Sequence, residues 1–384
     1  MPASNADTRK LKICLASWAP FLGGAEVAAG RLAVGLRRAG HDVVVLLGNR
    51  GEAFDHIEKQ GVRCLYAPTP MTSKWHPWTY LLARARIGRI LRRERPDLVH
   101  SNDLPTHQII SDAARRLGIP RICHHRWIFD GPAIDWLNKY GAERHLFVSQ
   151  GLMDPLTAES AKLKASPRAV VYDGLPLPPV PTDADRQQAR RELQLPTDKA
   201  IVAFTGQIIE RKGVADLIRA WSLLPAATRK QSELVIVGDD LAGEGAYRRE
   251  METLAAELNV PARFVGFQNN VDRWLISSNI ATVPSHAEPL GNATLEAMSL
   301  ALPVIGGKVG GIPEMVVHEQ TGLLVPPRDP EGLAAALERL LTDESLRRQL
   351  GQAARSRCED KFSLQAHVDS VLAQYQFVLP EGTQ

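Results

Sequence analysis

Short runs of β-branched and other apolar residues alternate with helical stretches along the whole chain of 384 residues. Most runs are apolar throughout, which is typical of strands buried on both faces of a parallel sheet. Alternation of strand and helix predicts βαβ units and a doubly wound sheet. The expected strands of the first half are residues 12–18, 42–47, 62–66, 97–101, 121–125, 145–149 and 169–172, and those of the second half are 200–205, 233–237, 263–266, 281–284 and 303–305.

A proline-rich segment separates two copies of this plan. Leu175-Pro-Leu-Pro-Pro-Val-Pro181 holds four prolines in seven residues, which excludes a helix or a central strand. We therefore expect an α/β protein with two doubly wound Rossmann-like domains, residues 1–174 and 183–362, joined by a linker at 175–182. The last amphipathic stretch, within residues 363–384, is expected to return to the first domain. Ligands of such folds bind at the carboxyl ends of the strands, which predicts chemistry in a cleft between the domains.

Charge is distributed unevenly between the two halves. Residues 1–173 hold 25 Lys and Arg against 16 Asp and Glu, a net charge of +9, and the remainder holds 21 against 27, a net charge of −6. A basic first half predicts an anionic partner. An arginine-rich stretch with leucine and isoleucine at helical spacing, residues 81–95, fits a solvated helix face or a face that docks on anionic lipid headgroups. The stretch lacks aromatic stacking motifs, so no nucleic-acid partner is expected.

Neither the start of the chain nor its cysteines indicate export. Residues 1–10 are polar and the apolar runs are too short to span a membrane, so we expect a cytoplasmic protein. The four cysteines are scattered without a Cys-x-x-Cys pair, which favours free thiols and disfavours a structural zinc site. A His-Glu-x-x-His pattern is also missing, and Asp183-Ala-Asp185 lies away from the expected strand ends. No metal and no cofactor are therefore expected.

The strongest motif runs from Glu288 to Glu296, after the expected strand at 281–284. Pro289 and Gly291 interrupt the chain before a helix, so Glu288 is expected in the loop and Glu296 one or two turns into the helix. Free backbone N–H groups at the helix start form an anion site, and the carboxylates can accept hydrogen bonds from sugar or ribose hydroxyls. The alternative is a capped helix with solvated acids.

Two glycine motifs follow other expected strands. Gly206 comes directly after one strand, and the cations of Arg211 and Lys212 can neutralise a diphosphate there, unless the segment is an ordinary basic turn. The pair Gly23-Gly24 precedes a helix whose N-terminal amides can bind phosphate, unless the pair only forms a tight turn. Neither segment matches GxGxxG or GxxxxGK[ST], which disfavours a dehydrogenase and a P-loop protein.

Eight of the eleven histidines fall in the first half of the chain. His100 ends one expected strand, and His124 and His125 end another. We expect both strand ends to face the cleft. A histidine at such a position can hydrogen-bond a sugar hydroxyl or move a proton, and the alternative is a satisfied residue of the core.

Taken together, these segments resemble the retaining glycosyltransferases of family four, which have the GT-B fold. The resemblance covers nearly the whole chain and is most specific in the second half. The specific pieces are, in chain order, Arg263-Phe-Val-Gly266, Pro284, Glu288–Met298, Gly310-Gly-Ile-Pro-Glu314 and Thr321-Gly-Leu-Leu-Val-Pro326. The weaker pieces are Gly23–Glu26, Val99-His100, Ser149 and Tyr172-Asp173-Gly174.

The resemblance implies a role for each matching residue. Glu288 would contact the donor sugar and stabilise the reacting centre, Lys212 would bind the diphosphate, and Glu296 would hold the ribose. His125 would face the sugar as the third catalytic residue, with His124 as the alternative for a one-residue slip in the alignment. The implied donor-binding residues are Gly23, Gly24, Gly206, Arg211, Lys212, Leu290, Gly291, Asn292, Thr294 and Glu296.

The implied activity is transfer of a hexosyl group, with retention of configuration, from a nucleotide diphosphate sugar to a hydroxyl acceptor. UDP is the commonest nucleotide of such donors, and basic groups rather than a metal would carry the phosphate charge. Together with the basic first half, the resemblance suggests a glycan or lipid-linked glycan acceptor. The corresponding pathway would be bacterial lipopolysaccharide, capsule or exopolysaccharide biosynthesis, on an enzyme peripheral to the inner face of the cytoplasmic membrane.

Three positions depart from the family pattern. Gln207 stands where relatives usually carry Arg, a charge that a neutral amide cannot replace, and Arg211 is the expected compensation. Leu290 replaces a common Phe, and Asp173 replaces the usual Asn in a turn. Two other functions stay open at this point: a nucleotide-sugar epimerase or phosphorylase of similar fold, and a non-catalytic sugar-nucleotide binding subunit, which Gln207 favours.

Overall fold

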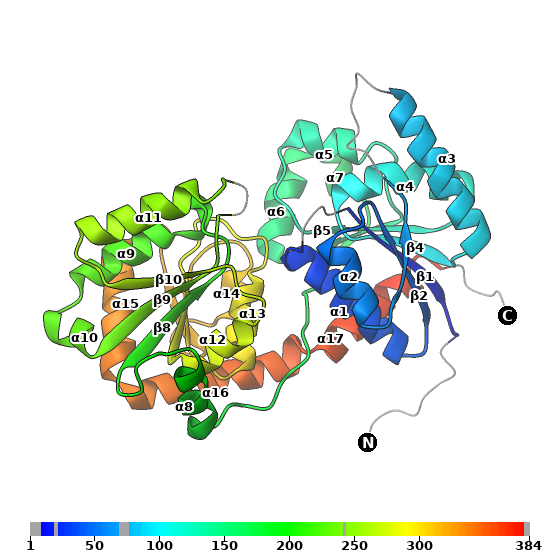
Figure 1. Cartoon of the computed structure of the whole chain (residues 1–384). Helices are drawn as coiled ribbons and strands as arrows, with labels where there is room; N and C mark the ends of the chain where they lie inside the picture. The colour runs from blue at the N-terminus through cyan, green and yellow to red at the C-terminus, as the bar shows by residue number, and fades with distance from the viewer. Residues whose placement is uncertain (1–8, 19–21, 69–76, 241–242, 380–384) are drawn as a thin grey trace. The chain divides into compact units, whose positions relative to one another are not determined.

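The computed structural model describes residues 9–18, 22–68, 77–240 and 243–379. The chain divides into two compact units, Met1–Gly174 with Leu364–Gln384, and Leu175–Ser363. Each unit is built on one all-parallel sheet with helices packed on it (Figure 1). The α/β, doubly wound fold class expected from the alternating runs is confirmed.

The first sheet has seven strands in the order β3-β2-β1-β4-β5-β6-β7. The order reverses between β1 and β4, which are hydrogen-bonded neighbours, so the loops that follow these two strands leave the sheet in opposite directions. The strands are β1 Lys12–Ser17, β2 Asp42–Leu47, β3 Arg63–Tyr66, β4 Leu98–Ser101, β5 Arg121–His125, β6 Arg144–Phe147 and β7 Arg168–Val170.

Helices cover the first sheet over two separate hydrophobic clusters. The helix α17 belongs to this unit, because Val368, Val371 and Tyr375 are buried in the cluster that β1 and β2 form. Gly35 on α1 permits its approach, since a Cβ there would lie 2.5 Å from Val368. The helices are α1 Gly24–Arg38, α2 Glu52–Lys59, α3 Pro77–Glu94, α4 Leu104–Arg116, α5 Gly131–Leu137, α6 Gln150–Glu159, α7 Ala161–Ala165 and α17 Leu364–Gln376.

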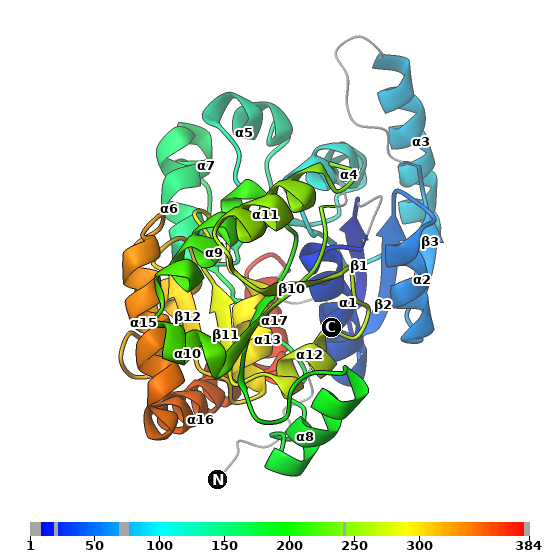
Figure 2. The same ribbon diagram turned by 60° about the vertical axis from the view of Figure 1, so that its left-hand side comes forward.

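The second sheet has six strands in the order β10-β9-β8-β11-β12-β13, and it reverses between β8 and β11. Its strands β11 and β12 lie side by side in Figure 2. The strands are β8 Ala200–Thr205, β9 Ser232–Val237, β10 Ala262–Gly266, β11 Ile280–Val283, β12 Val304–Gly307 and β13 Gly322–Val325. The strand β13 is not among the expected strands, although its residues belong to the family motif Thr321–Pro326.

The helices of the second unit pack on a core that includes Phe204, Trp221 and Leu337. The two segments that enter and leave this unit run beside each other, because the Leu175 N–H donates to the Phe362 carbonyl at 3.1 Å. The helices are α8 Asp183–Glu192, the 3₁₀ turn η1 Glu210–Lys212, α9 Val214–Leu223, α10 Ala226–Lys230, α11 Ala246–Glu257, α12 Val271–Ser277, α13 Asn292–Ser299, α14 Ile312–Met315, α15 Pro330–Thr342 and α16 Glu344–Lys361. Among the helices of the described residues, none is both long and apolar enough to cross a bilayer.

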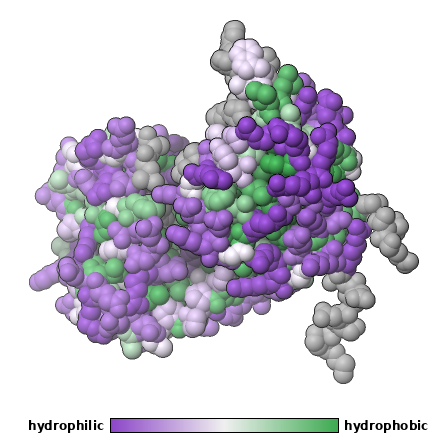
Figure 3. Space-filling view, turned by 45° about the vertical axis from the view of Figure 1, so that its right-hand side comes forward, coloured by the Kyte–Doolittle hydropathy of each residue, from purple (hydrophilic) through white to green (hydrophobic). Residues whose placement is uncertain are grey.

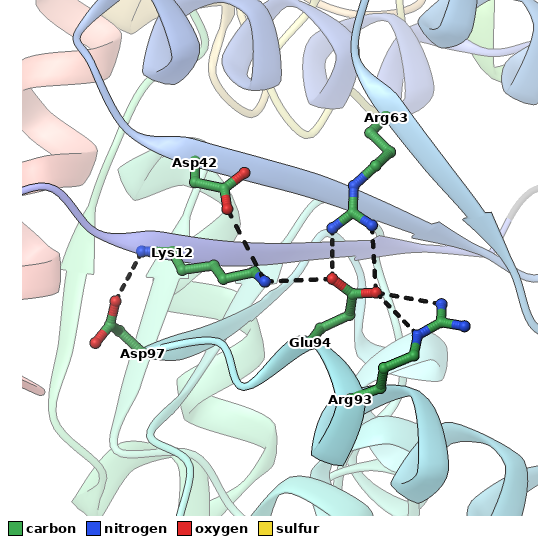
Figure 4. A network of polar contacts seen from close by, with 6 residues as sticks. All are labelled: Lys12, Asp42, Arg63, Arg93, Glu94 and Asp97. Atoms are coloured by element: carbon green, nitrogen blue, oxygen red, sulfur yellow. Dashed lines mark hydrogen bonds and ion pairs between the residues drawn. The ribbon is translucent and has the colours of Figure 1, made fainter.

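A network of charged side chains closes the amino end of the first sheet (Figure 4). The buried carboxylate of Glu94, at the end of α3, binds the Arg63 guanidinium at 3.2 Å and the Lys12 ammonium at 3.3 Å. The backbone N–H of Lys12 donates to Asp97 at 2.7 Å. Because these residues precede or begin strands, the network lies at the edge opposite the carboxyl ends and holds the sheet together there.

Candidate active site

Lys212 and Glu288 meet where the order of the second sheet reverses. Lys212 ends the turn η1 after β8, and Glu288 lies in the loop after β11. The Lys212 ammonium donates to Oε2 of Glu288 at 2.5 Å. Loops that leave a parallel sheet at such a reversal form the crevice where ligands of α/β folds bind. The structure therefore brings together the two residues on which the expected site depends.

The Glu288 carboxylate is surrounded by donors. Besides Lys212, the Ser285 hydroxyl donates to Oε2 at 3.3 Å, and the Arg211 guanidinium lies 3.6 Å from it. The side chains of Glu288 and Lys212 are only 8% and 16% exposed, so their charge interaction is strengthened in a partly dry environment, whereas the Arg211 side chain is 42% exposed and more strongly screened. Such a site can bind a polyanion with its cations and hydroxyls with its carboxylate.

Glycines let the backbones of three loops touch around this ion pair. Gly213 has φ +72°, and a Cβ there would lie 2.0 Å from the Pro284 carbonyl oxygen. A Cβ on Gly310, in the loop after β12, would lie 1.7 Å from the Glu288 carbonyl oxygen. Only glycine fits such positions, because no side chain can occupy space already filled by backbone.

The start of α13 adds a second group of donors. Gly291 precedes the helix with φ +105°, and Asn292 is its first residue. The hydroxyl of Thr294 is buried and has no hydrogen-bond partner among the residues that the structure describes. Leu290 is buried, and Glu296 lies in the second turn of the helix, as the spacing predicted. Backbone N–H groups at a helix start, with a hydroxyl beside them, suit an anionic ligand.

Gly206 directly follows β8 and has φ +148°. A Cβ on Gly238, after β9, would lie 1.8 Å from the Gly206 carbonyl oxygen, so the loops after β8 and β9 also touch. The next residue, Gln207, is exposed and neutral. The exposed guanidinium of Arg211 donates to the Ala287 carbonyl at 3.3 Å, which holds a positive charge beside Lys212.

The first unit has a polar group of its own where its sheet order reverses. Gly23 precedes α1, which begins at Gly24, and the Gly23 N–H donates to the Glu26 carboxylate at 3.1 Å. Glu26 is buried, and burial raises the pKa of its carboxyl to about 7. The Ser17 hydroxyl, at the end of β1, lies 3.5 Å from the same carboxylate. The glycine pair thus stands at a helix start, as expected, but its first turn already contains an acid.

A buried ion pair lies beside this group and was missed by the sequence reasoning. The Arg126 guanidinium, directly after β5, binds the carboxylate of Asp173 at 2.5 Å and the Asn102 amide oxygen at 2.8 Å. Both charged side chains are almost fully buried. Asp173 is the residue that replaces the usual Asn, and the ion pair with Arg126 gives that replacement a physical reason, since a buried guanidinium needs a carboxylate.

Comparison with known proteins decides the family. Residues 185–357 match the family Glycosyl transferases group 1, and residues 23–203 match the Glycosyl transferase 4-like domain. An uncharacterized glycosyltransferase of Methanocaldococcus jannaschii is 27% identical over 92% of this chain and 95% of its own. The lipopolysaccharide core biosynthesis glycosyltransferase LpsD of Rhizobium meliloti is 28% identical over 76% of this chain and 78% of its own. The chain belongs to glycosyltransferase family four.

The fold of this glycosyltransferase is GT-B. The structure of HepE from Anabaena in complex with UDP-glucose superposes with a TM-score of 0.83 at 20% identity, covering 95% of this chain and 99% of HepE. Sucrose-phosphate synthase from Thermosynechococcus elongatus superposes with a TM-score of 0.80 at 25% identity, covering 96% of this chain and 98% of that chain. The resemblance stated from the sequence motifs is therefore confirmed at the level of family and fold.

The expected role of His125 needs correction. Its ring stacks on Phe147, and its Nε2 lies 3.0 Å from Nδ1 of His145 in the interior of the first unit. The side chain is 1% exposed, and burial lowers its pKa to about 3, so it stays neutral. The fallback, His124, is also fully buried. His125 does end the strand β5, as expected. However, side chains on a sheet that is covered on both faces point into a core, and the first residue beyond the carboxyl end of β5 is Arg126.

Within the described residues, one group of three side chains could hold a metal ion. Potential ligand atoms of Cys123, His125 and His145 lie within 4.8 Å of one another, on neighbouring strands β5 and β6. All three are buried, and burial keeps the thiol protonated by raising its pKa far above the usual value. The imidazoles already bind each other. This group lies on β5 and β6 of the first unit and includes none of the residues around Glu288.

Proposed function

We propose that this glycosyltransferase transfers a hexosyl group from a nucleotide diphosphate sugar to a hydroxyl acceptor, with retention of configuration and without a metal. The observation that carries the proposal is the contact between Lys212 and Glu288 at the reversal point of the second sheet. The contact supports the proposal because a cation that suits a diphosphate and a carboxylate that suits sugar hydroxyls lie side by side. Lys212, Glu288 and Arg211 are the residues assigned to the reacting centre.

In the proposed reaction, the residues of the site stabilise the charges that develop as the donor is cleaved. As the bond between sugar and diphosphate breaks, negative charge grows on the leaving diphosphate and positive charge on the sugar ring. Lys212, Arg211 and the N-terminus of α13 stabilise the diphosphate, and the Glu288 carboxylate stabilises the ring. The leaving diphosphate takes the proton of the acceptor hydroxyl on the same face, which retains the configuration. Glu296 and Thr294 bind donor hydroxyl or phosphate groups at the start of α13.

Variants of the ion pair test the assignment. We expect Lys212→Ala and Glu288→Gln each to lower turnover by about 100-fold or more, because each removes a charge that acts on the transition state. Lys230→Ala and Glu257→Gln change exposed residues elsewhere in the second unit and serve as matched controls. Folded variants at Lys212 and Glu288 that keep wild-type turnover would refute the assignment.

The proposal that no metal is needed depends on side-chain cations that can balance the charge of the diphosphate. Arg211 and Lys212 supply the cations that a divalent ion would supply in other transferases. The Asp183-Ala-Asp185 segment is the first turn of α8, where the Asp185 carboxylate accepts hydrogen bonds from the N–H of the N-cap residue Thr182 at 2.8 Å and from the Thr182 hydroxyl at 2.7 Å. We expect full transfer activity in EDTA. Loss of activity in EDTA that manganese restores would overturn this part of the proposal.

UDP is the first nucleotide to test in the donor. HepE, which shares the fold, has been solved in complex with UDP and with UDP-glucose. A panel of nucleotide sugars in a thermal-shift assay identifies the donor, because a ligand that binds the folded state raises the melting temperature. Release of free nucleotide diphosphate in the absence of acceptor then distinguishes an enzyme from a binding subunit. No shift with any UDP-sugar would contradict the choice of base.

The acceptor is proposed to be a glycan or lipid-linked glycan of a bacterial surface, reached from the cytoplasmic face of an anionic membrane. LpsD is named for lipopolysaccharide core biosynthesis. In this chain, α3 exposes Trp78, Leu81 and Leu82, by 57%, 48% and 69%. Figure 3 shows hydrophobic surface bordered by hydrophilic side chains in the upper part of the view, where α3 lies.

The rest of α3 exposes cations on the same helix. Arg86, Arg89 and Arg92 are exposed, whereas Ile87 and Leu91 are buried against the first sheet. Apolar residues at one end of a helix and arginines along it suit insertion among acyl chains with contact to anionic headgroups. Vesicle flotation tests this: wild type should bind phosphatidylglycerol vesicles at low salt, and Arg86→Glu with Arg89→Glu should not. Indifference to anionic vesicles, with transfer only to small soluble acceptors, would refute the membrane proposal.

A further inference from the structure

A histidine–aspartate pair joins the two loops that carry the reacting centre. His286 lies two residues before Glu288, and Asp216 lies in the first turn of α9, four residues after Lys212. Nε2 of His286 donates to Oδ2 of Asp216 at 2.6 Å. Each side chain is only 11% exposed, so solvent competes little for this hydrogen bond.

The pair is part of a series of contacts between the two loops. The backbone N–H of His286 donates to the Arg211 carbonyl at 2.7 Å, and the Arg211 guanidinium donates to the Ala287 carbonyl at 3.3 Å. The Lys212–Glu288 ion pair follows at 2.5 Å. Of these contacts, only the one between His286 and Asp216 joins two side chains that the proposed reaction does not use.

We propose that His286 and Asp216 are positioning residues, which hold the Lys212 turn against the Glu288 loop. The proposal rests on the proposed function and adds two residues to it. Gly213, between Lys212 and α9, has no side chain with which to pack, and its backbone lies against Pro284. The imidazole–carboxylate contact therefore supplies a directional link between the two loops beside a residue that has no side chain of its own.

The other contacts of His286 and Asp216 identify a control variant for testing this hydrogen bond. Asp216 uses its second oxygen, Oδ1, to bind the exposed Arg219 guanidinium at 3.3 Å. Nδ1 of His286 is buried and has no partner within the part of the chain that the structure describes. The ring is thus oriented by one hydrogen bond to one carboxylate oxygen. Removing Arg219 alters the other oxygen and leaves the link between the loops in place.

Misplacement by about 1 Å of groups that stabilise a transition state can cost about 100-fold in rate. We therefore expect His286→Ala and Asp216→Ala to lower kcat by about 10- to 100-fold, with a small change in KM for the donor. His286→Gln should keep kcat within about threefold of wild type, because the glutamine amide can replace Nε2 as the donor. Arg219→Ala should behave as wild type.

Two readouts separate positioning from general stability. If His286→Ala and Asp216→Ala melt at lower temperature but keep wild-type kcat, or if His286→Gln is as slow as His286→Ala, positioning through this hydrogen bond is refuted. The imidazole nitrogens of ¹⁵N-histidine protein provide the second readout: His286 should carry its proton on Nε2, and Asp216→Ala should change that resonance. This resonance reports on the contact between His286 and Asp216 even if the protein uses no nucleotide sugar as a donor. Failure of the positioning proposal can therefore be distinguished from failure of the proposed function. A resonance that ignores Asp216→Ala overturns the proposal.

Discussion

Replacing Glu94 with glutamine is expected to destabilise the first unit by about 2 to 3 kcal/mol at neutral pH. The hydrogen bond from Arg63, followed by that from Lys12, lowers the pKa of Glu94 from 4.5 to about 2. A lowering of this size corresponds to about 3 kcal/mol at about 1.4 kcal/mol for each pH unit. Glu94 is 6% exposed but Arg63 is 49% exposed, so solvent screening moves the expected value toward the lower end.

The same pKa fixes how the effect depends on pH. A carboxyl group whose folded pKa is depressed stabilises the folded state above its unfolded pKa, and this contribution is lost as the pH falls through the folded value. The difference between wild type and Glu94→Gln should therefore be constant from pH 8 to about pH 5.5. It should shrink between about pH 4.5 and pH 2, where the wild-type carboxylate takes up a proton.

Urea unfolding followed by circular dichroism measures this difference, with a separate transition fitted for each of the two units. Glu58→Gln is the matched control, because Glu58 is an exposed carboxylate on α2 of the same unit. The reasoning fails if Glu94→Gln lies within about 0.5 kcal/mol of the control at pH 7, which is the usual range for surface substitutions. A difference that stays unchanged down to pH 3 would refute the assignment of the effect to this carboxylate.

Three further predictions follow from other buried contacts. Burial raises the pKa of Glu26 to about 7, so its ionisation destabilises the fold, and wild type should lose on the order of 3 kcal/mol relative to Glu26→Gln between pH 4.5 and pH 8 in the same urea assay. Asp173→Asn leaves the Arg126 guanidinium buried without its carboxylate and should cost about 3 kcal/mol, measured by thermal and urea unfolding. Gly213→Ala forces a Cβ to within 2.0 Å of the Pro284 carbonyl oxygen, and should abolish transfer in an activity assay while the first unit still unfolds at the wild-type urea concentration.

Much of the fold could be predicted because burial leaves a direct mark on the sequence. The expected ranges 42–47, 121–125 and 200–205 coincide with β2, β5 and β8, since apolar runs bounded by polar residues coincide with strands buried on both faces. The strand β13 escaped because it has four residues, begins with a glycine and is followed by Pro326, which reads as a turn. Short strands are assigned mainly by their neighbours in the sheet, which the sequence does not contain.

The site could be predicted less completely, because it also depends on which strands are neighbours in the sheet. Each loop could be placed at a strand end, but the contact between Lys212 and Glu288 requires β8 and β11 to be neighbours although 74 residues separate the end of one from the start of the other. The partnership of Arg126 with Asp173 spans 47 residues and carries no local signal. For His125 the position along the strand was predicted correctly but the environment of the side chain was not. The position of a residue along a strand does not determine whether its side chain lies in a core or at the edge of the sheet.

Net charge predicts an anionic partner for the first unit, whereas the diphosphate is proposed to bind in the second unit. The local distribution of charge explains this difference. At the reversal point of the first sheet, the Arg126 guanidinium is already paired with the buried Asp173 carboxylate and interacts with the buried Glu26, so its charge is not free for a polyanion. The second half carries a net charge of −6, yet Arg211 and Lys212 stand at its reversal point beside one carboxylate. A bound diphosphate responds to charges within a Debye length of about 10 Å, not to the sum over a domain. The basic excess of the first half lies partly on exposed surface such as α3, the helix that we propose contacts an anionic membrane.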